Sequence, residues 1–200
     1  MAKRISAFLL LVFVCVSSGA AKEIQGAQLP DTLAFAGDKL VLNGGGVRTK
    51  KYVMAVYVAG LYLKQKSQDA KQIIEADEPM AIRLQVISSL VTSKKMTEAT
   101  EEGFGAATVG KTAAIRDKID TFIAVFKEGI QKGDFYDLVY LPGEGVDAYK
   151  NERLVTTVPG LDFKKALFGI WLCEKPAINT SLKEGMLGRW RQGVSQCPNP

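Results

Sequence analysis

Hydrophobic positions along the chain follow two periods, one typical of strands and one typical of helices. The longest apolar run extends from Tyr52 to Leu63 and carries almost no charge, with apolar residues on both alternating sides. This pattern predicts a central strand that is covered on both faces. On one side of the strand the small residues Ala55 and Ala59 flank Tyr57, so we expect open space around this phenol.

Shorter alternating runs predict the remaining strands. They occupy residues 29–44, as one or two strands around a turn at Gly37 and Asp38, and then residues 80–90, 135–141, 146–149 and 153–158. The last two runs are separated by a short turn, so we expect them to pair as a hairpin.

Apolar residues at helical spacing separate these strands. Predicted helices begin at Ser67, at Thr92 or Ser93 and at the cap residue Asp162, and further helices span residues 111–130 and 181–187. Because no linker, repeat or low-complexity tract divides the chain, we expect one domain over residues 22–200. The order of strands, helices, strands and helix predicts an α+β fold, with helices packed on one face of an antiparallel sheet.

Residues 1–21 have the composition of a secretory signal peptide. A basic start at Lys3 and Arg4 precedes an apolar run, and small residues up to Ala21 follow. The apolar run is too short for a membrane-spanning helix. We therefore expect cleavage after Ala20 or Ala21 and an exported mature protein, either periplasmic or secreted.

Export would allow the cysteines to form a disulfide, because disulfides persist in oxidising compartments. Removal of the signal peptide would leave Cys173 and Cys197. A bridge between them would contribute roughly 3 kcal/mol by constraining the unfolded chain. The alternative is a pair of unrelated thiols.

Composition and charge exclude several classes of function. The chain is 47% hydrophobic and 24% charged, as in globular proteins. It contains no histidine, which excludes histidine metal sites and catalysis by Ser-His or Cys-His pairs. The net charge of +5 is spread without a basic and aromatic cluster, so we expect no nucleic-acid partner. We also expect no metal and no cofactor.

The strongest candidate for chemistry is Arg48, which follows the glycines at 44–46 and precedes the central strand. Glycines permit unusual backbone conformations and the close approach of a ligand. A guanidinium pairs well with a carboxylate or an enolate-like oxygen, and Tyr57 is placed to donate to the same anion. The alternatives are an arginine paired with a surface carboxylate and a tyrosine bonded within the core.

The residues around Arg48 also resemble a known family. GGGVR at 44–48, followed by VYVAGLYL at 56–63, resembles the second- and third-strand signature of the chalcone isomerase superfamily, and more closely its exported bacterial branch. The likeness continues through LVTSKKMTEATEEGF at 90–104 and FKKALFGIWLCEKPAINTSLKEGMLG at 163–188. It implies an open-faced β-sandwich with a ligand cleft between the large sheet and the helix layer.

The resemblance also implies which catalytic groups are changed. In the plant chalcone isomerases an arginine polarises the substrate carbonyl, while a threonine, a tyrosine and an asparagine order the site. The resemblance places these four positions, in that order, at Arg48, Tyr57, Met96 and Gly103. Only the arginine is kept, and the other three polar groups are absent or changed. Because oxygen-stabilising donors are often worth roughly 3 kcal/mol each, efficient flavanone formation is not expected.

The resemblance therefore favours the non-catalytic branch, whose members bind fatty acids with the carboxylate on the matching arginine and a tyrosine. We expect a binding protein for a fatty acid or similar amphipathic anion, with ligand contacts from Arg48, Tyr57, Met96, Thr100 and Gly103. One alternative is an isomerase of the intramolecular lyase type, acting on an unknown enone with Arg48 as electrophile. The other is an envelope scaffold protein with a vestigial cleft.

Overall fold

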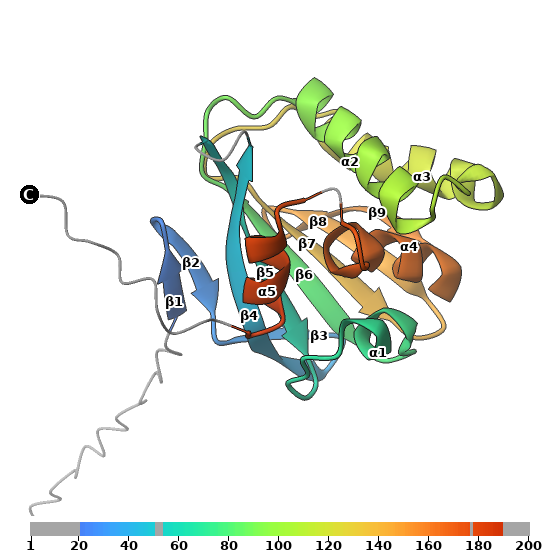
Figure 1. Ribbon diagram of the computed structural model, residues 1–200, viewed down its shortest axis with the longest axis horizontal. Helices are drawn as coiled ribbons and strands as arrows, with labels where there is room; N and C mark the ends of the chain where they lie inside the picture. The colour runs from blue at the N-terminus through green and yellow to red at the C-terminus, as the bar shows by residue number, and fades with distance from the viewer. Residues whose placement is uncertain (1–20, 51–53, 177, 190–200) are drawn as a thin grey trace, which may run out of the picture.

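The computed structural model describes residues 21–50, 54–176 and 178–189 (Figure 1). Seven strands form one antiparallel sheet in sequence order. They are β3 (Thr32–Phe35), β4 (Asp38–Lys50), β5 (Met54–Leu63), β6 (Met80–Val86), β7 (Phe135–Leu141), β8 (Gly145–Lys150) and β9 (Arg153–Val158). A separate hairpin consists of β1 (Ala21–Ile24) and β2 (Ala27–Pro30).

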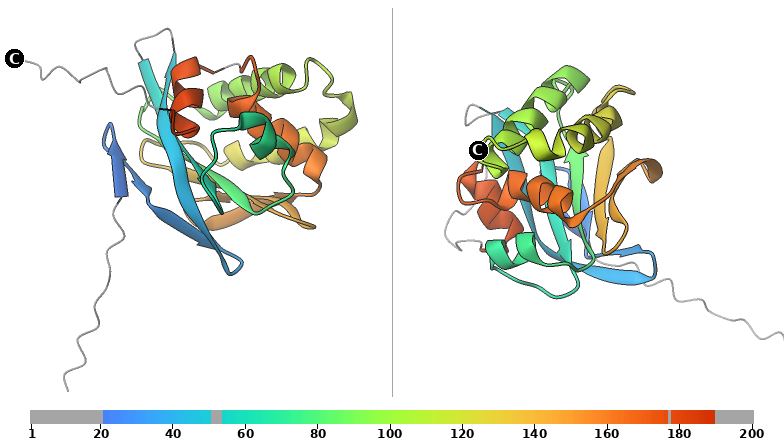
Figure 2. Two further views of the ribbon diagram at one scale, coloured as in Figure 1. Left: turned by 60° about the horizontal axis from the view of Figure 1, so that its bottom comes forward. Right: turned by 90° about the vertical axis from the view of Figure 1, so that its right-hand side faces the viewer.

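The helices gather on one face of the sheet, as the two further views in Figure 2 show. They are α1 (Ala70–Glu75), α2 (Ser93–Ala107), α3 (Arg116–Ile123), α4 (Leu161–Leu172) and α5 (Thr180–Met186), with short 3-10 turns η1 (Ala113–Ile115) and η2 (Ala124–Phe126). The curled antiparallel sheet under a helix layer confirms the predicted α+β open-faced sandwich. None of the helices in the described residues is long and apolar enough to cross a membrane.

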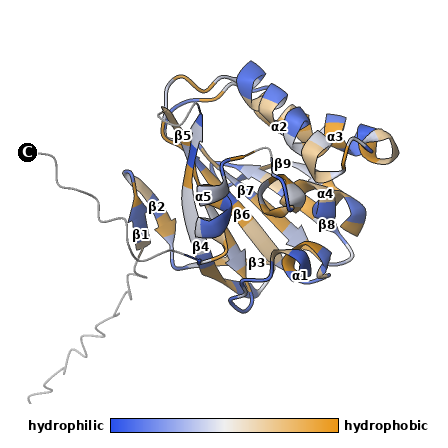
Figure 3. Ribbon diagram, in the orientation of Figure 1, coloured by the Kyte–Doolittle hydropathy of each residue, from blue (hydrophilic) through white to orange (hydrophobic). Residues whose placement is uncertain are grey.

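Strand β5 is buried from both sides, as its apolar pattern predicted. Tyr57 and Leu61 belong to the core between the sheet and the helices. Val58 and Tyr62 belong to a second core, between the sheet and the β1–β2 hairpin, which also contains Leu29. Figure 3 shows the matching pattern on the helices, where hydrophobic and hydrophilic bands alternate along α2 and α4.

The glycines before Arg48 have a different role from the one expected. A Cβ atom on Gly44 would lie 2.2 Å from the carbonyl oxygen of Gly185, and a Cβ on Gly185 would lie 2.6 Å from the carbonyl oxygen of Gly45. Backbone therefore packs on backbone where β4 meets α5. Gly44 therefore admits a helix of the same chain, and a Cβ on Gly45 would lie 2.5 Å from Leu29 Cδ1 of the β1–β2 hairpin.

Three predicted helices differ in their limits, and the one expected from Ser67 begins at Ala70 after the N-cap residue Asp69. The helix expected over 111–130 is interrupted at Ile115, whose φ of −124° and ψ of 19° are not helical, and 3-10 turns lie on both sides of α3. The expected cap Asp162 lies within the first turn of α4, because Gly160 is the N-cap residue. The carboxylate of Asp162 instead accepts a bond from Lys118 Nζ at 2.7 Å.

Two expectations concern residues outside the described ranges. The signal peptide falls almost wholly in residues 1–20, and Cys197 follows the last described residue. Cys173 is half-buried just after α4, and burial raises the pKa of its thiol. The signal peptide and the disulfide therefore stay predictions.

Candidate functional site

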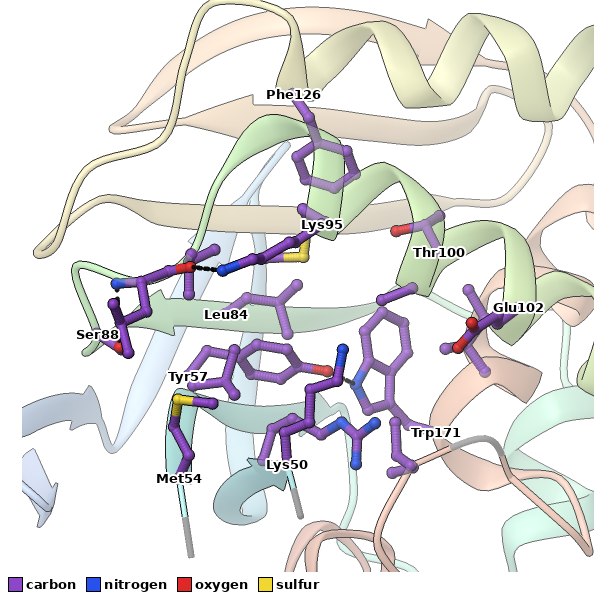
Figure 4. Close-up of a pocket in the computed structure, with 18 of the residues that line it drawn as sticks. Lys50, Met54, Tyr57, Leu84, Ser88, Lys95, Thr100, Glu102, Phe126 and Trp171 are labelled. Carbon is purple, nitrogen blue, oxygen red and sulfur yellow. Dashed lines mark hydrogen bonds between the residues drawn. The ribbon is translucent and has the colours of Figure 1, made fainter.

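A cavity of about 340 Å³ lies between the inner face of the sheet and the helix layer (Figure 4). Its floor comes from β4 to β7, and its walls come from α2, α4 and the segment around α3 and η2. The deep part is apolar and is lined by Leu84, Phe122, Phe126, Leu138 and Ile170. The expected cleft is therefore present between the sheet and the helices.

Arg48 and Tyr57 lie side by side at the polar end of this cavity. They are direct partners in the antiparallel register of β4 and β5, so their side chains share the inner face of the sheet. Both residues line the cavity. The strands thus bring together the two side chains that the sequence singled out.

A β-bulge next to this pair changes which residues of β5 face the cavity. Arg48 pairs with Tyr57 but Thr49 pairs with Ala55, which leaves Val56 as an extra residue. Consequently Val56 and Met54 line the cavity and Ala55 does not. The expectation that Ala55 opens space beside Tyr57 was therefore wrong, because it assumed an unbroken alternation.

The phenol of Tyr57 is held as a hydrogen-bond donor. Its side chain is buried, and its oxygen accepts a bond from Trp171 Nε1 at 3.1 Å (Figure 4). Burial raises the pKa of Tyr57 against the opposing effects of the Trp171 bond and the Arg48 charge. The hydroxyl therefore keeps its hydrogen at neutral pH, and among the described residues none accepts that hydrogen.

Asn179 braces the strand on both sides of Arg48. Its Oδ1 accepts a bond from the Thr49 N–H at 3.1 Å, and its Nδ2 donates to the carbonyl of Val47 at 3.1 Å. Arg48 Nη1 donates to the carbonyl of Thr49 at 3.0 Å and to the same Asn179 Oδ1 at 3.4 Å. These bonds fix the backbone of β4 and restrict the arginine at the cavity.

Helix α2 supplies two of the predicted site residues but not the third. The side chain of Thr92 caps the helix by accepting from the Lys95 N–H at 3.3 Å. Met96 and Thr100 follow on the inner side, where they line the cavity. Gly103 instead packs on α4, since a Cβ there would lie 2.7 Å from Cγ2 of Ile170. It is a packing position and does not line the cavity.

Sequence reasoning missed Trp171 and Asn179. Trp171 lies one helical turn after Leu167, so its spacing is that of a core residue and does not show that its N–H bonds to Tyr57. Asn179 precedes α5 and carried the signal of a helix cap, yet its side chain bonds to β4 and to Ser181 Oγ instead of capping the helix. An indole N–H and an amide near the end of an apolar helix were the available signals.

The charges on the cavity lining favour an anion. Three cations, Arg48, Lys50 and Lys95, line it together with one carboxylate, Glu102. Lys95 Nζ donates to the carbonyl of Leu90 at 2.9 Å. Among the described residues, no group of three or more metal-ligating side chains is arranged to hold an ion.

This combination of a curled antiparallel sheet, a helix layer and an apolar cavity between them defines an open-faced β-sandwich. A family model described as chalcone isomerase-like matches residues 21–188, so the chain belongs to the chalcone isomerase-like family. A solved structure with the same fold is a fatty-acid binding protein of Arabidopsis thaliana. It is 18% identical, with a TM-score of 0.69, and the match covers 84% of this chain and 95% of that one. No curated protein matches the sequence.

Proposed function

We propose that this protein binds a fatty acid or similar amphipathic anion, with the head group held by Arg48 and Tyr57. The observation that carries the proposal is the pairing of these two residues on the lining of a cavity of about 340 Å³ whose deep part is apolar. Small-molecule sites have volumes of about 300–1,000 Å³, so a ligand of this class fits.

The chemistry of the cavity matches the two ends of such a ligand. A guanidinium offers forked donors to a carboxylate, and a neutral phenol adds one more. Met54 and Met96 on the lining suit an alkyl chain, because methionine adapts its shape to flexible ligands. The Arabidopsis protein of the same fold is a fatty-acid binding protein, which supports the same ligand class here.

Both alternatives have less support. For an isomerase, the helix positions that carry tyrosine and asparagine in the plant enzymes are Met96 and Gly103, and Gly103 packs on Ile170 without lining the cavity itself. For a scaffold with a vestigial cleft, side chains would fill the space, whereas a cavity of about 340 Å³ is present. The binding role therefore fits the described residues best.

The proposal is tested by native mass spectrometry of protein purified without detergent, followed by solvent extraction of any bound molecule. We expect a stoichiometric fatty acid, and a loss of affinity of roughly 10- to 100-fold in Arg48→Ala, since a charge-assisted bond contributes about 1.5–3 kcal/mol. Arg153→Ala is the matched control, because Arg153 lies on β9 and pairs with Glu128. An apo protein that takes up no added fatty acid would refute the binding role.

We further propose that the protein is exported and belongs to the exported bacterial branch of the family. The support is the charge and hydropathy pattern of residues 1–21. N-terminal sequencing of the protein from its native host should begin at Ala21 or Lys22. An intact Met1 in the native protein would contradict export through this signal.

A further inference from the structure

The rim of the cavity carries an exposed leucine. Among the described residues, the large hydrophobic side chains that are exposed are Leu90, Val109 and Leu154. Only Leu90 of these three lines the cavity, with 57% of its surface exposed. It lies in the loop between β6 and α2, next to the charged start of α2. Its apolar surface therefore faces solvent at the entrance of the cavity.

Exposed cations line the same cavity as this leucine or lie next to such a cation in the chain. Lys95 Nζ donates to the carbonyl of Leu90 at 2.9 Å, which holds the ammonium beside it. Lys50 lies on the same lining, and Lys94 has 86% of its side chain exposed. The acidic groups nearby are Glu98, whose carboxylate is 4.0 Å from Lys94 Nζ, and Glu102. The rim therefore combines an exposed leucine with more cations than carboxylates.

We propose that this rim, formed by Leu90, Lys50, Lys94 and Lys95, docks on an anionic lipid surface and that the ligand passes directly between that surface and the cavity. This inference rests on the proposed function. Leucine inserts at the boundary of the acyl chains while lysines pair with anionic head groups. A docked rim lets an alkyl chain leave the bilayer without crossing water, which is the step that the hydrophobic effect opposes.

The test measures flotation of the ligand-free protein with vesicles of phosphatidylcholine alone or mixed with phosphatidylglycerol. We expect flotation only with the anionic vesicles, weakened by salt, and about a tenfold loss of partitioning in Leu90→Glu and in Lys94→Glu. Leu154→Glu and Lys71→Glu are matched controls that keep wild-type flotation. Leu154 is 48% exposed on β9, and Lys71 is the second residue of α1 as Lys94 is of α2.

A second readout follows the transfer of a fluorescent anthroyloxy fatty acid from the protein to the same vesicles. Docking predicts a rate that rises with vesicle concentration and with phosphatidylglycerol content. Equal flotation of all four variants, or a transfer rate independent of the vesicles, would overturn docking while leaving ligand binding intact. Failure to bind the fluorescent fatty acid would count against the proposed function instead, and flotation would still decide whether the rim docks.

Discussion

The layer between the sheet and the helices contains a fully bonded cation, Lys164, at one end and a cation beside a cavity, Arg48, at the other. At the end covered by α1, Lys164 is fully buried, and its Nζ donates to the carbonyls of Ile73, Ile74 and Ala76 at 2.8, 2.9 and 2.7 Å. These carbonyls belong to the C-terminal end of α1, which a helix by itself leaves without donors. The fold therefore uses this charge to hold one of its own helices.

At the other end, Arg48 lies beside a cavity. Asn179 fixes the strand around it, and Tyr57 keeps a hydroxyl hydrogen that no described residue accepts. Packing is less complete here, because a space of about 340 Å³ remains between sheet and helices. The two cations therefore differ in their surroundings, since Lys164 bonds to backbone carbonyls inside the fold whereas Arg48 borders an open space.

Removing the ammonium group of Lys164, at the end covered by α1, should have the largest effect on stability. Lys164→Met keeps the alkyl stem but leaves buried carbonyls without a donor, each at about 1–3 kcal/mol. Because the variant also removes a buried charge, which is costly in itself, we expect a net loss of about 2–4 kcal/mol in the free energy of unfolding. Urea denaturation measures this loss.

Lys165→Met is the control for this change. Lys165 is the next residue of α4 and also contacts α1, but its Nζ pairs with Glu75 at the surface. Exposed ion pairs contribute little, so the control should stay within about 0.5 kcal/mol of wild type. Equal losses in both variants would contradict a special role for the buried ammonium.

The pH dependence of stability should sharpen the same point. Burial, assisted by the charge of Lys165, lowers the pKa of Lys164 to about 8, whereas an unfolded lysine titrates near 10.4. The unfolded chain therefore binds more protons between these two values, and stability rises with pH across this window. Relative to Lys164→Met, wild type should gain up to about 3 kcal/mol from pH 8 to pH 10.4. Parallel curves for the two proteins would show that this lysine does not titrate there.

The sequence predicted much of the fold because the relevant signals are local. The alternation over Phe135–Leu141 and Arg153–Val158 matches the observed strands at both ends. The threonine cap at Thr92 likewise depends only on its neighbours. The site was partly predictable for the same reason, since Arg48 and Tyr57 lie on successive strands of one hairpin.

The remaining site residues depend on contacts between distant segments. Trp171 bonds to a residue 114 positions away and Asn179 to one 130 positions away. Lys164 was not singled out from the sequence because helical spacing marks only one face, whereas every residue of α4 from Phe163 to Leu172 except Lys165 is buried. Local periodicity contains no information on which helix lies above another.

The smallest predicted effect concerns the hydroxyl of Tyr57 beside the cavity. Trp171→Phe keeps an aromatic ring but removes the N–H that bonds to the phenol oxygen at 3.1 Å. Since one neutral hydrogen bond contributes about 0.5–1.5 kcal/mol, fatty-acid affinity should fall by roughly two- to tenfold. The affinity for the methyl ester of the fatty acid should change less, because the ester has no charged carboxylate to accept a hydrogen bond from the phenol.

A double-mutant cycle separates this role from general packing. If Trp171 acts through the phenol, Trp171→Phe should have no further effect on affinity in a Tyr57→Phe background. Tyr140→Phe is the control, because Tyr140 is a buried tyrosine at the packed end whose hydroxyl donates to Asp77 at 2.5 Å. That variant should lose stability and keep ligand affinity. Additive losses from Tyr57→Phe and Trp171→Phe would show that the indole contributes by packing alone, and that the orientation of the phenol is set elsewhere.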